Sequence, residues 1–258
     1  FRIAALTSAG SGLPGASVAA TPYGSAATPS ALTATPDNGQ VSLSWTAPTD
    51  TGGAAISGYQ IERSVSGGAF TVLIADTAST ATSTVIGGLT NGTTYAFRVS
   101  ARTAGGVGAA SSPMSAVPFT SAGSPTAVTA VAAASSVALS WTAPSFDGGR
   151  AITGYLVEQS ADGGVTWTTA IADTASTTMS ATVTGLTSGL IYSFRIAAIT
   201  ADVPTSRTLI GVRSAVVTSV PFTTPAAPTA LAAAASDTQV ALSWSAPTSN
   251  GGAPITGY

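Results

Sequence analysis

Acidic side chains in glycine-rich segments are the residues of this sequence whose type and spacing most resemble a site for chemistry. Asp50, Asp147 and Asp162 each lie within two residues of a Gly-Gly pair, an arrangement that suggests calcium ligation. Calcium takes about six to eight oxygen ligands, whereas each segment offers only one or two acids. We therefore expect no metal site here, and instead expect turns in which the Asp side chain caps the backbone and glycine supplies a positive φ.

The composition gives catalysis little support. The 258-residue chain contains no His, Cys or Lys, so the commonest general bases, thiol nucleophiles and Schiff-base amines are missing. Its ten acids are dispersed, and no two of them stand out as the facing carboxylates that glycoside hydrolysis requires. We predict that the chain is not an enzyme, has no catalytic residues and needs no cofactor.

Charge and hydrophobicity restrict the partners of the chain. A net charge of −2 gives no basic surface for nucleic acid, and no apolar run reaches the roughly 18 residues of a membrane span. Low charge with much Ser, Thr, Ala and Gly is typical of exported bacterial surface proteins. We expect an extracellular or cell-surface location, with protein partners (self-association or neighbouring repeats) or surface glycans.

Aromatic motifs reveal the elements that organise the chain. The segment Ser-Leu-Ser-Trp45-Thr-Ala-Pro recurs almost unchanged around Trp141 and Trp244, and the three copies are about 100 residues apart. Each Trp is followed, at one fixed offset, by the Tyr of an Ile-(Ser/Thr)-Gly-Tyr motif. A fixed period of this kind indicates a tandem array of one domain type.

The repeats predict a division of the chain into four parts. We expect the C-terminal part of one repeat, two complete repeats and the N-terminal part of another, at 1–23, 28–119, 124–222 and 227–258. The chain would then begin and end within a domain, which we interpret as a window on a longer array. The alternative is a polymer in which such ends complete each other between subunits.

Apolar residues alternate with polar ones along the expected strands. Val41, Leu43 and Trp45 alternate with serines, and period two with one apolar face is typical of half-buried antiparallel strands. About seven short strands per repeat predict a two-sheet sandwich. The alternation points the aromatic rings inward, so we interpret them as core rather than as a sugar-stacking platform. The predicted core aromatics are Trp45, Tyr59, Tyr95, Phe97, Trp141, Tyr155, Tyr192, Phe194 and Trp244.

These motifs carry a family resemblance. The order Pro29, Trp45, Gly58-Tyr59 and Leu89-Thr-Asn-Gly-Thr-Thr-Tyr95, repeated in the second copy, resembles a fibronectin type III domain over nearly the whole chain. The resemblance implies tandem immunoglobulin-like, seven-stranded, all-β sandwiches with Trp on strand B and Tyr on strand C. It also implies a corner before strand F, where the hydroxyl of Tyr95 or Tyr192 bonds to the backbone upstream.

Charged residues on the outer face follow from the same resemblance. Because it makes strands C and F neighbours, we predict the cross-strand ion pairs Arg98–Glu62 and Arg195–Glu158. Exposed pairs of this kind contribute only about a few tenths of a kcal/mol. The alternative is a set of independent solvated charges.

The loop before the last strand distinguishes the second repeat. It is six residues longer than in the first repeat, within Thr200–Val212. One interpretation is a partner-contact loop, and the other is neutral drift in length. Integrin binding is not implied, because the Arg-Gly-Asp motif of animal relatives does not occur in this chain. The candidate contact residues are Asp202, Pro204, Arg207 and Arg213.

Two functions remain open from the sequence. The main hypothesis is a non-catalytic structural repeat array, such as a stalk, fibre or sheath component of a bacterial surface protein. The alternative is an adhesin, or a carbohydrate-binding or spacer module attached to a secreted enzyme. Phe146 is the best candidate for an exposed aromatic that could stack on sugar. Short linkers that contain proline, Phe119–Pro125 and Phe222–Pro228, predict restricted hinges.

Overall fold

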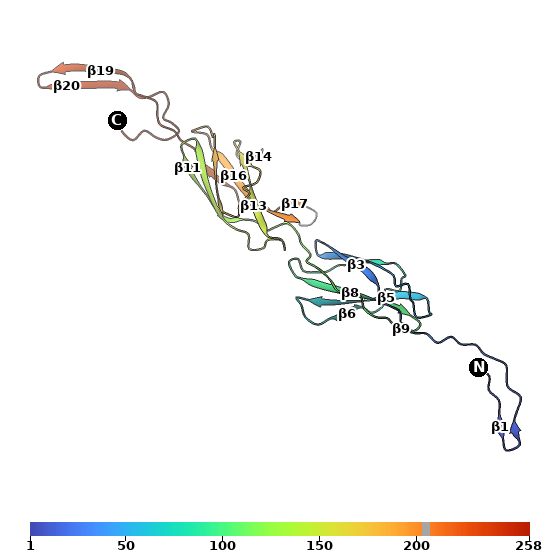
Figure 1. Ribbon diagram of the computed structural model, residues 1–258. Coiled ribbons are helices and arrows are strands. Elements are labelled where there is room, and N and C mark those ends of the chain that lie inside the picture. The colour runs from blue at the N-terminus through green and yellow to red at the C-terminus, as the bar shows by residue number, and fades with distance from the viewer. Residues whose placement is uncertain (203–206) are drawn as a thin grey trace. The chain divides into compact units, whose positions relative to one another are not determined.

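The chain folds entirely into strands, turns and loops in a computed structural model that describes residues 1–202 and 207–258 (Figure 1). Contacts divide it into two units, Phe1–Phe119 and Thr120–Tyr258, which we describe separately. The prediction of an all-β fold is confirmed. Within the described ranges there is no helix long and apolar enough to cross a membrane.

The first unit contains a two-sheet sandwich and a short N-terminal hairpin. One sheet has the strand order β3-β4-β7, and the other β10-β8-β5-β6 with β9 also paired to β8. The strands of the sandwich are β3 (Ser30–Asp37), β4 (Gln40–Thr46), β5 (Ile56–Val65), β6 (Thr71–Ile74), β7 (Ser83–Ile86), β8 (Tyr95–Thr103), β9 (Gly106–Val107) and β10 (Met114–Ala116). The hairpin is formed by β1 (Leu6–Thr7) and β2 (Gly10–Ser11).

The second unit repeats this topology and adds a C-terminal hairpin. Its sheets have the orders β11-β12-β15 and β14-β13-β16-β17, and β18 also pairs with β16. The strands of the sandwich are β11 (Thr126–Ala133), β12 (Ser136–Thr142), β13 (Ile152–Ser160), β14 (Thr168–Ile171), β15 (Ser180–Thr184), β16 (Tyr192–Asp202), β17 (Arg207–Ile210) and β18 (Val217–Ser219). The hairpin is formed by β19 (Thr229–Ser236) and β20 (Gln239–Ser245).

The inward face of each strand builds the core. Along β4 the buried residues alternate with exposed serines, because successive side chains of a strand point to opposite faces. Trp45 packs edge-on against Tyr59 and Trp141 against Tyr155, each with ring centroids 5.0 Å apart. Tyr95, Phe97, Tyr192 and Phe194 are buried in the same two cores.

Trp244 lies in a different environment. It is 42% exposed and packs beside Tyr258, with ring centroids 5.3 Å apart. Among the described residues β19 and β20 form a two-stranded sheet by themselves, with no second sheet packed on the hairpin. The same motif therefore gives a buried side chain in a complete sandwich and a half-exposed one in the hairpin.

The Gly-Tyr motif of β5 is explained by the loop that follows β6. The Tyr59 N–H donates to Thr77 Oγ1, and the Thr77 N–H donates to the Tyr59 carbonyl, each at 2.9 Å. A β-carbon on Gly58 would collide with Asp76 Oδ1. Equivalent contacts surround the Gly-Tyr pair of β13. The motif therefore contains glycine because this loop passes close to the strand.

Candidate functional site

The corner before strand F has the geometry that the resemblance implied. Tyr95 Oη accepts the Thr90 N–H at 3.0 Å, and Tyr192 Oη accepts the Thr187 N–H at 3.2 Å. Both rings stay buried, and only the hydroxyl reaches the turn. The prediction of these two hydrogen bonds is confirmed, and their role is to fix the turn that leads into β8 and β16.

Replacing Tyr192 by Phe is expected to lower the free energy of unfolding of the second repeat by about 1–2 kcal/mol. The ring remains, but the part-buried Thr187 N–H loses its partner, and unsatisfied buried donors cost this much. Urea denaturation followed through the amide of Ile196 in β16 measures the effect. The matched variant Tyr95→Phe should weaken the first repeat and leave Ile196 unaffected; an unchanged midpoint for Tyr192→Phe would contradict the assignment.

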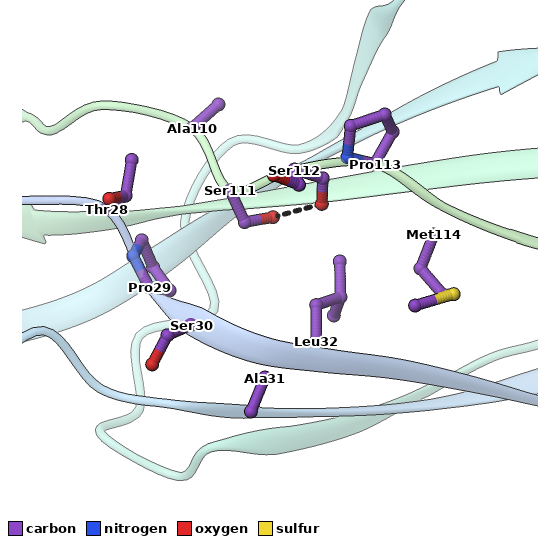
Figure 2. Close-up of a pocket in the computed structure, with 10 residues that line it drawn as sticks. All are labelled: Thr28, Pro29, Ser30, Ala31, Leu32, Ala110, Ser111, Ser112, Pro113 and Met114. Atoms are coloured by element: carbon purple, nitrogen blue, oxygen red, sulfur yellow. Dashed lines mark hydrogen bonds between the residues drawn. The ribbon is translucent and has the colours of Figure 1, made fainter.

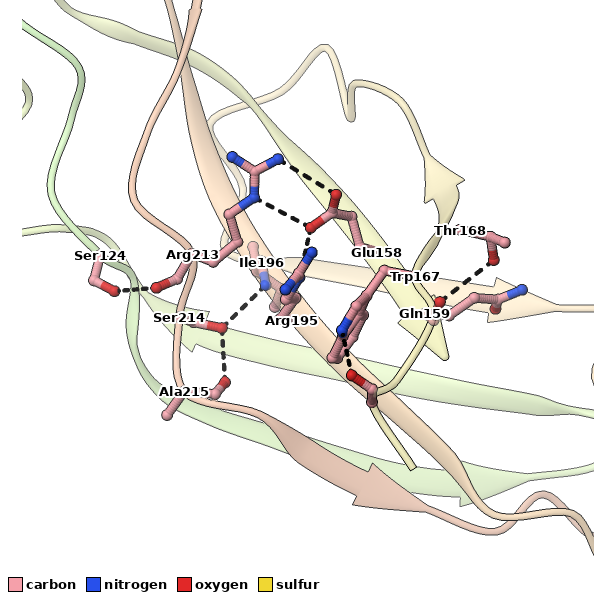
Figure 3. Close-up of polar contacts among 11 residues, drawn as sticks. Ser124, Glu158, Gln159, Trp167, Thr168, Arg195, Ile196, Arg213, Ser214 and Ala215 are labelled. Carbon is pink, nitrogen blue, oxygen red and sulfur yellow. Dashed lines mark hydrogen bonds and ion pairs between the residues drawn. The ribbon is translucent and has the colours of Figure 1, made fainter. Parts of the chain in front are cut away.

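Ion pairs occupy the outer face of the larger sheet in each repeat. Arg98 Nε lies 2.6 Å from Glu62 Oε2, and Arg195 Nε lies 2.7 Å from Glu158 Oε2. Both predicted pairs are confirmed. In the second repeat a further cation joins, because Arg213 Nε lies 3.2 Å from the same Glu158 oxygen (Figure 3). Glu158 is thus the centre of a three-residue cluster that the sequence patterns did not predict.

Aromatic rings extend these charge clusters on the other side. The Arg195 guanidinium lies 4.1 Å from the ring centroid of Trp167, and the Arg98 guanidinium lies 4.5 Å from that of Phe70. The Trp167 indole N–H donates to the Gly164 carbonyl at 2.9 Å (Figure 3), which fixes the ring over the cation. Neither aromatic was predicted from the sequence as part of a site, although each follows the Gly-Gly pair after its strand C within three residues.

The three aspartates considered for calcium cap turns. Asp50 Oδ1 accepts the Gly52 N–H at 2.9 Å, and Asp147 Oδ1 accepts the Gly149 N–H at 2.8 Å. The Ser160 hydroxyl, and then the Thr166 hydroxyl and N–H, hold the pKa of Asp162 well below its ordinary value. The turn prediction is confirmed. Among the described residues no three acids form a group that could hold a metal ion.

The hairpin of β16 and β17 in the second repeat has a longer ladder than its counterpart in the first repeat. The β16–β17 ladder runs from Ile199↔Ile210 to Asp202↔Arg207, whereas the β8–β9 ladder contains two residue pairs. Pro204 lies outside the described residues, as do the side chains of Asp202 and Arg207. Arg213, the fourth candidate contact residue, lies after the hairpin and turns its guanidinium toward Glu158.

Two other surfaces could receive a partner. Phe146 is 43% exposed in the loop between strands B and C. In the first repeat, a groove of about 450 Å³ runs between the start of β3 and the segment before β10 (Figure 2). Its hydroxyl Ser111 Oγ is already engaged, since it accepts the Val99 N–H and donates to the Ser112 carbonyl, each at 3.1 Å. The groove is lined by uncharged residues, so it offers shape and weak polarity but no acid or base.

Comparison with known proteins gives the family. Residues 27–117 and 123–211 match the model of the fibronectin type III domain. The chain is 32% identical over 234 residues to exoglucanase B of Cellulomonas fimi, which covers 85% of this chain and 19% of that protein. It is 35% identical over 167 residues to endoglucanase B of Cellulomonas fimi, a match that covers 60% of this chain and 15% of that protein. It is 34% identical over 167 residues to chitinase A1 of Niallia circulans, a match that covers 61% of this chain and 21% of that protein.

The chain therefore spans about a fifth or less of the length of these curated relatives. Over the matched ranges the two complete sandwiches share the strand order, the Trp–Tyr core pair and the tyrosine corner. These features and the family match cover most of the chain. The chain belongs to the fibronectin type III domain family.

Proposed function

We propose that this chain is a non-catalytic spacer within a secreted bacterial enzyme that degrades an insoluble polysaccharide. The observation that carries the proposal is the similarity to an exoglucanase, an endoglucanase and a chitinase, each several times longer than the matched segment. A shared segment in proteins named for different substrates is better suited to a common mechanical task than to one chemistry. The spacer would work outside the cell, with the other domains of its own polypeptide as neighbours.

The chemistry of the chain is consistent with this role. It contains no His, Cys or Lys. Glu62 and Glu158 are engaged by arginines, and Asp50 and Asp147 cap turns. The fibre or sheath hypothesis receives less support, since the relatives are named for enzymes.

We extend the proposal to the domain division. The register of the β1–β2 pair repeats that of β8–β9, and the register of the β19–β20 pair repeats that of β3–β4. Residues 1–23 and 227–258 are then parts of neighbouring repeats.

The test begins with the coding sequence on both sides of this segment. A glycoside hydrolase domain in the same reading frame is the expected result. A frame that holds only further copies of this repeat would overturn the proposal and favour the fibre.

The second test compares the intact enzyme with a variant in which 28–222 is replaced by a flexible Gly/Ser linker of equal length. Hydrolysis of a soluble oligosaccharide should be unchanged, because the spacer carries no catalytic group. Hydrolysis of crystalline cellulose or chitin should fall, because the spacing between domains is no longer defined. Equal activity of both proteins on the insoluble substrate would contradict a spacer function.

A further inference from the structure

Each linker before a repeat forms hydrogen bonds to the loop between strands B and C of that repeat. We define the three linker segments as 24–27, 120–123 and 223–226. In all three, the first and the fourth N–H groups donate to carbonyls of that loop, at 2.7–2.9 Å. The pairs are Gly24–Gly52, Ala27–Asp50, Thr120–Gly148, Gly123–Phe146, Thr223–Gly251 and Ala226–Ser249.

The segment after strand F closes the other side of the linker. In the second repeat the Val212 N–H donates to the Ala122 carbonyl at 3.0 Å, and the Ser124 hydroxyl donates to the Arg213 carbonyl at 2.6 Å (Figure 3). In the first repeat the Ala109 N–H donates to the Ala26 carbonyl at 3.3 Å. In both repeats the linker thus lies in a slot between the B–C loop and the segment that follows strand F.

A glycine is required in the wall of this slot. Gly52, Gly148 and Gly251 have φ values of +68°, +83° and +71°, a region that favours glycine. A β-carbon on any of them would also collide with the backbone carbonyl of the first linker residue. Two independent constraints, backbone conformation and close approach, therefore coincide at the first glycine of each Gly-Gly pair.

We propose that every repeat carries a docking slot for the linker that precedes it, and that the first glycine of the Gly-Gly pair determines whether the linker docks. The partner of the slot is an extended, uncharged segment of small residues. Because recognition uses backbone groups, the three linkers differ in sequence and still form the same bonds. The slot makes the linker a folded part of the following repeat, whether the chain serves as a spacer or as a fibre.

The substitution Gly148→Ala tests the slot in the full chain by amide hydrogen exchange. The matched control is Gly163→Ala, where φ is +77° and the new β-carbon meets nothing within 4 Å. Both variants place alanine at a similar positive φ, but only the first collides with the linker. We expect the Thr120 and Gly123 amides of Gly148→Ala to exchange roughly tenfold faster than in the control, the effect of losing about one hydrogen bond. The core amide of Ile196, which donates to Ser214 Oγ, should stay protected.

Equal linker exchange in the two variants would overturn the proposal, and so would unprotected linker amides in the unmodified chain. If Gly148→Ala also exposes Ile196, the variant Thr120→Pro decides, because it removes the linker donor and leaves Gly148 unchanged. Faster exchange at Gly123 in Thr120→Pro supports the slot, and unchanged exchange refutes it. The result is independent of the domains that flank the chain, so it can fail while the spacer function stands, or the reverse.

Discussion

Replacing Trp141 by alanine is expected to lower the free energy of unfolding of the second repeat by about 3–5 kcal/mol. Trp141 is only 5% exposed and stands at the centre of the core with Tyr155, which is 1% exposed. Its indole N–H makes no hydrogen bond to any described residue, so the loss is one of packing and of the cavity left behind. The prediction is measured by urea denaturation, followed through the protection of the Ile196 amide.

Trp244 offers a matched control for this substitution. It occupies the same sequence motif but is half exposed beside Tyr258, so Trp244→Ala should leave the stability of the second repeat unchanged to within about 0.5 kcal/mol. A comparable loss in both variants would indicate an effect of composition rather than of burial. A soluble Trp141→Ala protein of undiminished stability would refute the assignment of this ring to the core.

Replacing Glu158 by Gln should lower the stability of the second repeat by about 2 kcal/mol at neutral pH. The carboxylate accepts from Arg195 at 2.7 Å and from Arg213 at 3.2 and 3.3 Å, and hydrogen bonds to charged groups contribute about 1.5–3 kcal/mol each. The Glu158 side chain is only 14% exposed and has two arginine partners, so the expected effect exceeds the few tenths of a kcal/mol of a single exposed pair. The two guanidinium groups are partly exposed, which reduces the sum. The matched variant Glu62→Gln removes a carboxylate with one arginine partner and should affect only the first repeat.

The effect of Glu158 should depend on pH in a defined direction. Burial raises the pKa of the Glu158 carboxyl, but hydrogen bonds and charges from Arg213 and Arg195 lower the pKa by more than burial raises it. The pKa of Glu158 therefore lies below its ordinary value. The carboxylate therefore contributes its full stabilisation above the unfolded pKa of about 4.3 and loses it as the pH falls through the folded pKa. The difference between the unmodified chain and Glu158→Gln should shrink from pH 7 toward pH 3. A difference that stays constant over this range would show that the ion pairs do not stabilise the repeat.

The clusters on the outer face would serve the proposed spacer through stability rather than chemistry. The cluster in the second repeat joins two neighbouring strands to two loop segments. Glu158 lies on β13 and Arg195 on β16, whereas Trp167 immediately precedes β14 and Arg213 follows β17. Arg213 also offers its carbonyl to Ser124 beside the linker. Arg213 therefore connects the segment after β17 to both the sheet and the linker. The effect of a substitution at Arg213 should be interpreted together with the exchange of the linker amides.

The sequence alone determined the repeats, the strands and the cores of the two sandwiches, but not the exposure of Trp244, which was predicted as core and is 42% exposed. Burial that alternates with period two is a local property, so residues such as Val41, Leu43 and Trp45 predict their own orientation without knowledge of distant partners. The tyrosine corner was implied by the family resemblance, and its two partners, Tyr192 and Thr187, are only five residues apart. The pairs Arg98–Glu62 and Arg195–Glu158 required one further step, the neighbourhood of strands C and F that the family resemblance supplied.

Only the tertiary structure decided which distant groups meet in the loops and linkers. Arg213 reaches Glu158 across 55 positions of the sequence, and nothing periodic in the chain relates these two residues. The sequence predicts only that Gly148 is a turn residue. In the folded chain a β-carbon at this position would also collide with the Thr120 carbonyl. Contacts of this kind join loops that are distant in the sequence. Their backbones come close only after strand register and the packing of the two sheets have fixed the position of each loop.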